Sequence, residues 1–408
     1  MDFNASPKDF QVLFLDMNSF FATVEQQVQP TLRGIPIGVA PYTGNSGCII
    51  AASREAKEWG VKICRVGEAK KLCPKIKILE ARPALYMIYH KEIRRVIESF
   101  TPYFEALSID EFKIRLTPRD QNCKSAMELG VKIKQRIRDE VGDYLSCSVG
   151  VGPSGFLAKM AGERKKPDGL TVVTLKELKN FYSGLALMDI TGINWRTEAH
   201  LNKFGIYSPL EFYNSSLSRL REMLNHPGRL WYYRLRGYEV DEYISKTKTI
   251  GHSHVLAPEL RSRNGALSVI EKLIVKIGYR LRRDKLWAGG VVISLHFLDR
   301  GGFSLSRRVP YFSDNKTLST VVADLVKNCR WQSRPIYVSI STFNLSPMLG
   351  DQISIFSDIE KSRRISKALD QINDEYGANT ILPASMYGAE KSAPDRIPFG
   401  RPRYEILH

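Results

Sequence analysis

Long apolar runs are missing from this chain of 408 residues, and so is a leader-like start. No stretch approaches the roughly 20 apolar residues that a membrane-spanning helix needs. The first residues, Met1-Asp2-Phe3-Asn4, lack the basic and then apolar pattern of a secretory signal. We therefore expect neither a membrane segment nor secretion.

Closely paired cysteines are absent as well. The six cysteines are irregularly spaced, none belongs to a C-x-x-C pair, and several have apolar neighbours. Common zinc sites use closely spaced cysteine pairs, and disulfide frameworks are typical of short secreted chains rich in cysteine. We interpret these thiols as reduced packing residues and do not expect a zinc site. Internal repeats and low-complexity runs are also missing, so the length predicts a globular protein of two to four domains.

Acidic residues are scarce relative to basic ones. The chain has 60 Lys and Arg against 43 Asp and Glu, a formal net charge of +17. Residues 246–334 alone carry 17 basic and 6 acidic side chains. Such a surplus indicates a polyanionic partner, and without a membrane segment we interpret that partner as nucleic acid. The alternative is a basic but merely solvated surface.

Against this basic background, two segments place carboxylates beside apolar strands. The apolar run 12–15 leads to Asp16, and the run 107–109 leads to Asp110 and Glu111. Buried carboxylates are costly unless a cation or donor meets them, and oxygen ligands are what Mg²⁺ prefers. Carboxylates that hold metal in a basic protein indicate an enzyme acting on nucleic-acid phosphates.

The acid pair leaves an alternative open. Neighbours on a regular strand point to opposite faces, so Asp110 and Glu111 share a site only if the strand ends, bends or bulges there. Otherwise they are a solvent-facing pair in a hairpin, and Asp16 is a lone strand-end carboxylate.

Three cations are candidates for binding a triphosphate. Arg54 and Lys57 lie one turn apart near the start of a predicted helix, so they share a face. Lys166 belongs to a basic turn that follows another predicted helix. Taken singly, each is equally an ordinary surface charge.

Apolar periodicity divides the chain into an alternating strand and helix region, a run of short helices at 187–240, and a compact mixed module at 246–346. Predicted helices cover residues 19–29, 53–59, 67–72, 84–100, 124–141, 154–164, 265–285, 316–329 and 358–376. Predicted strands cover residues 11–16, 37–40, 48–52, 145–151, 290–298, 303–309 and 336–343, with an alternating segment at 112–116.

Four motifs occur in the order and at the separations of a known family. They are Phe14-Leu15-Asp16-Met17-Asn18-Ser19-Phe20-Phe21, Ala52-Ser53-Arg54-Glu55-Ala56-Lys57, Ser108-Ile109-Asp110-Glu111, and Ser148-Val149-Gly150-Val151 continuing to Lys166-Pro167-Asp168-Gly169. On these motifs the chain resembles the Y-family (DinB/UmuC-type) translesion DNA polymerases over roughly residues 10–346.

The resemblance implies an α+β multidomain fold, that of a right-handed polymerase with an α/β palm and fingers, a helical thumb and an α+β little finger. The implied divisions are palm at 1–28 and 81–180, fingers at 29–80, thumb at 181–242, DNA-binding little finger at 246–346 and a C-terminal tail at 347–408.

The resemblance also implies a catalytic set. Asp16 and Asp110 match the aspartates that bridge two metal ions, and Glu111 matches the third catalytic carboxylate. Met17 would offer its backbone carbonyl to the second metal. The implied cofactor is a pair of Mg²⁺ ions, with Mn²⁺ as a substitute.

A nucleotide-binding set is implied in the same way. Phe21 matches the steric gate that blocks a ribose 2′-hydroxyl, and its neighbour Phe20 belongs to the same set or to the core. Lys166 matches the triphosphate lysine. Arg54 and Lys57 occupy the positions where many members carry Tyr and Arg, and this difference alters the contacts with the nucleotide. Two further departures are Phe112 after the acid pair and Gly-Ile-Asn at 192–194 in place of Gly-x-Gly.

The implied partners are primer–template DNA and deoxynucleoside triphosphates. Gln352, Ile355 and Phe356 resemble the peptide by which bacterial polymerases dock on the sliding clamp, although an ordinary strand would show the same alternation. The implied protein is a monomer of the bacterial cytoplasm, associated with the nucleoid and with no membrane.

Two other functions fit parts of this pattern. One is a non-catalytic, polymerase-like adapter that binds DNA and the clamp in damage tolerance. The other is a metal-dependent nuclease or nucleotidyl cyclase built on a similar palm, although a cyclase does not need the basic C-terminal module.

Overall fold

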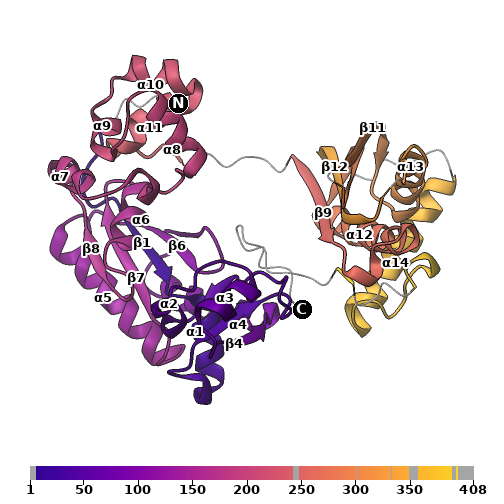
Figure 1. Ribbon diagram of the computed structural model, residues 1–408, viewed down its shortest axis with the longest axis horizontal. Coiled ribbons are helices and arrows are strands. Elements are labelled where there is room, and N and C mark those ends of the chain that lie inside the picture. The colour runs from indigo at the N-terminus through magenta and orange to yellow at the C-terminus, as the bar shows by residue number, and fades with distance from the viewer. Residues whose placement is uncertain are drawn as a thin grey trace. The chain divides into compact units, whose positions relative to one another are not determined.

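The computed structural model describes residues 6–241, 248–299, 301–331, 333–348, 357–387 and 392–393. The chain forms two compact units, which divide between residues 243 and 244 (Figure 1). Each unit has its own sheet and hydrophobic core. Within the described ranges, no helix is long and apolar enough to cross a membrane.

A five-stranded sheet in the order β5-β6-β1-β7-β8 is the centre of the first unit. Neighbouring strands are antiparallel except β7 and β8, which are parallel. The strands are β1 (Val12–Met17), β5 (Phe104–Ala106), β6 (Glu111–Arg115), β7 (Cys147–Gly152) and β8 (Leu170–Val172). The helices of the same region are α1 (Phe20–Val28), α4 (Pro83–Glu98), α5 (Cys123–Glu140) and α6 (Gly155–Glu163).

Side chains of β1 alternate between the two faces of this sheet. Leu13 and Leu15 enter the main core, which they share with apolar side chains of α4 and α5. Phe14 enters a smaller cluster with Ala158 of α6 on the other face. Because the period is two, Asp16 follows Phe14 onto the α6 face.

A three-stranded sheet in the order β3-β2-β4 has a separate small core that includes Ile49, Val61 and Val66. The Ser53 hydroxyl accepts from the amides of Ile37 at 3.1 Å and Ala56 at 3.3 Å, which ties the start of α2 to this sheet. The elements are β2 (Ile37–Ala40), β3 (Ala51–Ala52), α2 (Arg54–Glu58), α3 (Val66–Leu72) and β4 (Lys77–Glu80).

Short helices follow, packed around Leu201, Phe212 and Trp231. They are α7 (Leu178–Ser183), α8 (Trp195–Lys203), α9 (Pro209–Asn214), α10 (Leu217–Leu224) and α11 (His226–Leu235). Single 3₁₀ turns occur at η1 (Pro30–Leu32), η2 (Leu175–Glu177), η3 (Leu187–Asp189), η4 (Pro258–Leu260) and η5 (Ala384–Met386).

The second unit is an antiparallel four-stranded sheet in the order β11-β10-β12-β9 with helices on one face (Figure 1). Val291, Ile293 and Val338 point to the helices and are fully buried. Ser294 and Ser339 alternate with them and are half-buried on the other face. The elements are β9 (Thr249–Val255), α12 (Arg263–Arg283), β10 (Leu286–Phe297), β11 (Gly302–Phe312), α13 (Asn315–Lys327), β12 (Pro335–Pro347) and α14 (Ser357–Tyr376).

Most predicted elements are present within a few residues of their expected bounds. The strand expected at 48–52 is reduced to Ala51–Ala52, because Cys48 forms only an isolated bridge with Arg65. The expectation that an apolar strand ends at the acid pair is wrong. Residues 107–110 form a turn, and β6 begins at Glu111. The division into palm, fingers, thumb and little finger stays a prediction.

Candidate active site

Asp16, Asp110 and Glu111 lie on neighbouring segments of the central sheet. In the antiparallel register of β1 and β6, Asp16 is directly opposite Glu111, so their side chains are on one face. The amide of Met17 donates to the carbonyl of Asp110 at 2.9 Å. Because Asp110 belongs to the turn and Glu111 to the strand, the opposite-face rule for strand neighbours does not separate them.

Each of the three carboxylates is engaged by a donor. Asp16 Oδ2 is 3.0 Å from Lys166 Nζ, and Glu111 Oε1 is 2.5 Å from Lys159 Nζ. Asp110 Oδ1 accepts from the Ser108 hydroxyl at 2.5 Å. Lys159 belongs to α6 and Lys166 to the turn that follows it, so α6 and this turn supply the counter-charges for β6 and β1.

Burial dominates the electrostatics of this cluster. Desolvation raises the pKa of Asp16 to about 7, although the charge of Lys166 opposes the rise. Burial also raises the pKa of Asp110, against the hydrogen bond from Ser108. Burial lowers the pKa of Lys166, but the charges of Asp16 and Glu163 outweigh it and raise the pKa overall.

Two of the carboxylates contact lysines and the third contacts a serine hydroxyl, while Asp110 also acts electrostatically on Asp16 and Glu111 on Asp110. In the part of the chain that the structure describes, no three His, Cys, Asp or Glu side chains are grouped so as to hold a metal ion. The backbone therefore places Asp16 and Glu111 on adjacent strands and Asp110 in the turn before β6, while the three side chains contact Lys166, Lys159 and Ser108.

The predicted triphosphate cations separate into two groups. Lys57 of α2 is exposed but lies within electrostatic range of Lys166 and Asp16: desolvation and the charge of Lys166 lower its pKa, and the charge of Asp16 opposes them. Arg54 is also exposed but pairs with Glu58 on its own helix, at 3.6 Å. The structure brings Lys57 and Lys166 to the carboxylates but not Arg54.

Phe20 and Phe21 are both buried in the main core, with ring centroids 5.8 Å apart. The Phe21 ring also packs on Tyr86 of α4, at 4.7 Å between centroids. The Tyr86 hydroxyl donates to Glu25 Oε1 at 2.7 Å, and Arg82 donates to the same carboxylate. Tyr86, itself held by the Glu25 carboxylate, therefore fixes the position of the Phe21 ring.

Three residues of the site were not assigned a role by the sequence pattern. Lys159 lies between Val151 and Lys166 in the fourth motif, and its place in a helix that follows β7 could have suggested a partner for the acids. Asn18 hydrogen-bonds to the turn that carries Lys166. His90 donates from Nδ1 to the carbonyl of Ile109 at 2.7 Å and stacks on Phe112, and burial lowers its pKa to about 4.

The Gly-Ile-Asn departure in the short-helix region has a local explanation. Asn194 caps α8, and its side-chain oxygen accepts from the amides of Arg196 and Thr197 at 3.0 Å each. These two amides are therefore already satisfied. The clamp-like residues Gln352, Ile355 and Phe356 lie outside the described residues.

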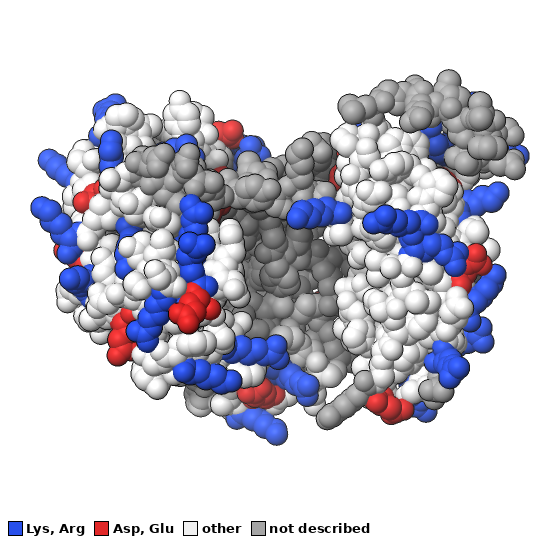
Figure 2. All heavy atoms as spheres, turned by 90° about the horizontal axis from the view of Figure 1, so that it is seen from above, with Lys and Arg blue, Asp and Glu red and all other residues white. Residues whose placement is uncertain are grey.

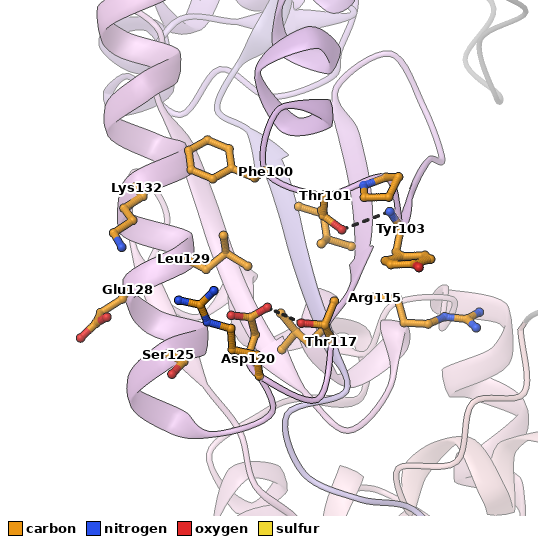
Figure 3. Close-up of a pocket in the computed structure, with 14 residues that line it drawn as sticks. Phe100, Thr101, Tyr103, Arg115, Thr117, Asp120, Ser125, Glu128, Leu129 and Lys132 are labelled. Atoms are coloured by element: carbon orange, nitrogen blue, oxygen red, sulfur yellow. Dashed lines mark hydrogen bonds between the residues drawn. The ribbon is translucent and has the colours of Figure 1, made fainter.

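A cavity of about 430 Å³ lies at the opposite end of β6 from the carboxylates (Figure 3). Its walls include Phe100, Arg115 and Lys132, and the Asp120 carboxylate in it accepts from the Thr117 hydroxyl at 2.6 Å. We assign this cavity no part in the site around Asp16.

Comparisons with known proteins identify the family of the chain. The impB/mucB/samB family model matches residues 15–163, and the model of that family's C-terminal domain matches residues 247–355. DNA polymerase IV of Moorella thermoacetica is 34% identical over 391 residues, which cover 93% of this chain and 97% of that protein. DNA polymerase IV 1 of Bacillus subtilis is 27% identical over 407 residues, covering 97% and 98%.

Solved structures give the fold. A Y-family DNA polymerase chimera of Dbh and Dpo4 superposes with a TM-score of 0.71 at 23% identity, covering 82% of this chain and 99% of that chain. The predicted α+β multidomain polymerase fold is therefore confirmed. The chain belongs to the impB/mucB/samB family and is a Y-family DNA polymerase of the DinB type.

Proposed function

We propose that the chain carries out template-directed, lesion-bypass DNA synthesis of low fidelity and without proofreading. The primer 3′-hydroxyl attacks the α-phosphorus of a deoxynucleoside triphosphate, and pyrophosphate leaves. The observation that carries this proposal is the register of β1 and β6, which sets Asp16 opposite Glu111 and beside Asp110. Phosphoryl transfer of this kind depends mostly on positioning and charge stabilisation.

The proposed metal ligands are Asp16, Asp110, Glu111 and the backbone carbonyl of Met17. Two Mg²⁺ ions, or Mn²⁺ in their place, would activate the attacking oxygen and neutralise the leaving one. The donors fit such ions, because all are oxygens and because burial raises the pKa of both aspartates. A buried carboxylate is stabilised as an anion by a cation or a hydrogen-bond donor, and Lys159 and Lys166 fill this role beside Glu111 and Asp16.

The proposed nucleotide site lies between α2 and the turn after α6. Lys57 and Lys166 approach the carboxylates from these two directions, so both would balance a triphosphate. Arg54 would have to leave Glu58 to join them. Phe21, with Phe20 packed beside it, would limit the space for the sugar.

The proposed DNA contact of the second unit is the open face of its sheet. Each of the four strands contributes one serine to a row that crosses the sheet in register. The hydroxyls of Ser294 and Ser304 in this row are hydrogen-bonded at 2.9 Å. Small hydroxyl side chains let a phosphate backbone approach closely, and they bind it without reading sequence. Basic side chains are numerous on the drawn face of both units (Figure 2). The row is Ser253, Ser339, Ser294 and Ser304.

The proposed further partner is a sliding clamp, bound through Gln352, Ile355 and Phe356. A glutamine with two apolar anchors suits a short extended peptide in a pocket. The segment directly precedes α14, which the ion pair of Arg282 with Asp370 anchors to the second unit. We place a monomer with this activity in the bacterial cytoplasm, at the nucleoid, where its template is.

The decisive experiment is primer extension by Asp110→Ala with Mg²⁺ and a labelled primer. Extension should fall by at least about 10³-fold, since a charge-stabilising group is removed, while primer–template affinity stays within about twofold. Asp120→Ala is the matched control, because Asp120 is an aspartate of the same unit at the far end of β6. It should extend primers at the wild-type rate.

The rival functions predict other products. Undiminished extension by Asp110→Ala would reject the proposed site. A wild-type protein that binds DNA and the clamp but extends no primer would be the adapter. A labelled primer that becomes shorter rather than longer would identify a nuclease. Templates with intact and damaged bases, each tested with single triphosphates, then define which lesions are copied.

A further inference from the structure

The turn that carries Lys166 is held from two sides. It joins α6 to β8, and Lys166 Nζ reaches Asp16 and Glu163 at 3.0 and 2.6 Å. On the outer side, the Asp168 carboxylate pairs with Lys134 at 3.1 Å and with Arg138 of α5. The contact on the inner side comes from Asn18, which stands two residues after Asp16.

Asn18 is almost completely buried, with 8% of its surface exposed. Its Oδ1 accepts from the backbone amide of Asp168 at 2.8 Å and from the Ser146 hydroxyl at 3.2 Å. Its Nδ2 donates to the Ser148 hydroxyl at 2.9 Å. Its own amide donates to the Ser146 carbonyl at 2.8 Å. One side chain therefore joins the end of β1, the start of β7 and the turn of Lys166.

We propose that Asn18 is a positioning residue that sets the distance between Lys166 and the carboxylates, and thereby the affinity for the incoming deoxynucleoside triphosphate. The proposal rests on the proposed function, because it concerns the same site. Asn18 acts through its hydrogen bond with the amide of Asp168, two residues beyond the lysine.

Few covalent bonds separate Asn18 from Asp16 and Asp168 from Lys166, so a change at Asn18 is passed directly to the Lys166–Asp16 pair. Asp16 and Asn18 are two residues apart at the end of β1, so they move together with that strand. Lys166 and Asp168 are two residues apart in the turn. The hydrogen bond from Asp168 to Asn18 and the ion pair of Lys166 with Asp16 close a small ring. Loss of the first contact frees the second to vary, and misplacement by about 1 Å can cost up to about 100-fold in function.

A purely structural role is the competing explanation. Asn18 also binds β7 through Ser148, and that contact alone would stabilise the end of the sheet. The two contacts can be separated. Asn18→Ala removes the contacts with Ser148, Ser146 and Asp168, whereas Ser148→Ala removes only the Ser148 contact and leaves the Asn18 oxygen to accept from Asp168.

The first arm of the test measures hydrogen exchange in the peptide that covers residues 165–169. Exchange of the Asp168 amide should become about tenfold faster or more in Asn18→Ala. It should stay within about twofold of wild type in Ser148→Ala. Asn18→Asp keeps an acceptor oxygen and should restore the protection. Equal exchange in wild type and Asn18→Ala would overturn the proposal without any assay of activity.

The second arm measures equilibrium binding of the matched triphosphate to the full chain with Mg²⁺ and a dideoxy-terminated primer–template. Asn18→Ala should weaken this binding about tenfold, with primer–template affinity unchanged. Ser148→Ala should weaken it by less than twofold. A Ser148→Ala loss equal to that of Asn18→Ala would show a structural role and reject the proposal. Failure of the wild type to bind triphosphate at all would instead reject the proposed function.

Discussion

Asp16 shows how a single side chain can be unfavourable for the fold and useful for the site. Its pKa is raised by burial from 3.8 in the unfolded chain to about 7. Between these values the folded state keeps a proton that the unfolded state has released, so this group lowers stability as the pH rises through that window. The charge of Lys166 opposes this rise but does not cancel it, so the pKa of Asp16 stays raised with the lysine in place.

The other informative residue is Phe21, whose ring is buried against Tyr86. We expect Phe21→Leu to lower discrimination between deoxynucleotides and ribonucleotides by about 10–100-fold, because a smaller side chain leaves room for the 2′-hydroxyl. Single-nucleotide incorporation with each type of triphosphate measures the ratio. Phe20→Leu is the matched control, since it removes the same volume from the same core. It should keep most of the discrimination, and unchanged selectivity in Phe21→Leu would place the gate elsewhere.

At the scale of elements, long amphipathic helices were predictable and short strands were not. The helix expected at 84–100 is α4, because its apolar spacing continues over four turns. β5 and β8 have three residues each, too few for an alternating pattern to be distinguished. They are strands because they pair with β6 and β7 at the edges of the sheet, and this pairing is a tertiary contact that the local sequence does not encode.

The candidate site was predictable in its residues but not in its side-chain contacts. Asp16, Asp110 and Glu111 stand out because acids beside apolar runs are unusual. The turn before β6 could not be read from the sequence, since the run 107–109 has the composition of a strand. Asn18 and Lys159 have partners more than 40 positions away, and no local pattern encodes such pairs.

α14 illustrates how an element can be held by polar contacts. Ser362, Ser366 and Asp370 recur at intervals of four and bind Asp314, the Asn315 amide and Arg282. The Arg282–Asp370 pair is bidentate, at 2.5 and 2.7 Å, with 11% and 19% of the side chains exposed. A helix held this way depends on each buried charge having its partner.

We therefore expect Asp370→Ala to release α14, at a cost of about 3 kcal/mol, because Arg282 is left buried without its carboxylate. Hydrogen exchange in peptides from residues 361–376 should become about 100-fold faster. Asp324→Ala is the control, because Asp324 forms a half-exposed pair with Arg307. It should change exchange in α14 very little. Full protection of α14 in Asp370→Ala would mean that apolar contacts, not this pair, hold the helix.

At the scale of the whole molecule, basic side chains and serine hydroxyls would contribute to polyanion binding in different ways. The net charge of +17 gives attraction that depends on salt, because each neutralised phosphate releases counterions. The serine row on the second unit offers hydrogen bonds that involve no charge. Arg308 lies on the same open face, opposite Gly290, whereas Arg307 lies on the other face and pairs with Asp324.

Because the charged and the hydroxyl side chains are different residues, substitutions can separate the salt-dependent attraction to phosphates from hydrogen bonding that involves no charge. Arg308→Ala should make the slope of log affinity against log salt shallower by about 0.9, since one phosphate contact is lost. Ser339→Ala should weaken binding about two- to tenfold, the value of one hydrogen bond, with the slope unchanged. Arg307→Ala should change neither quantity much, because its side chain faces α13. Titrations of a labelled primer–template at several salt concentrations measure both. If Arg307→Ala and Arg308→Ala made the slope shallower by the same amount, the open face of the sheet would not be the DNA surface.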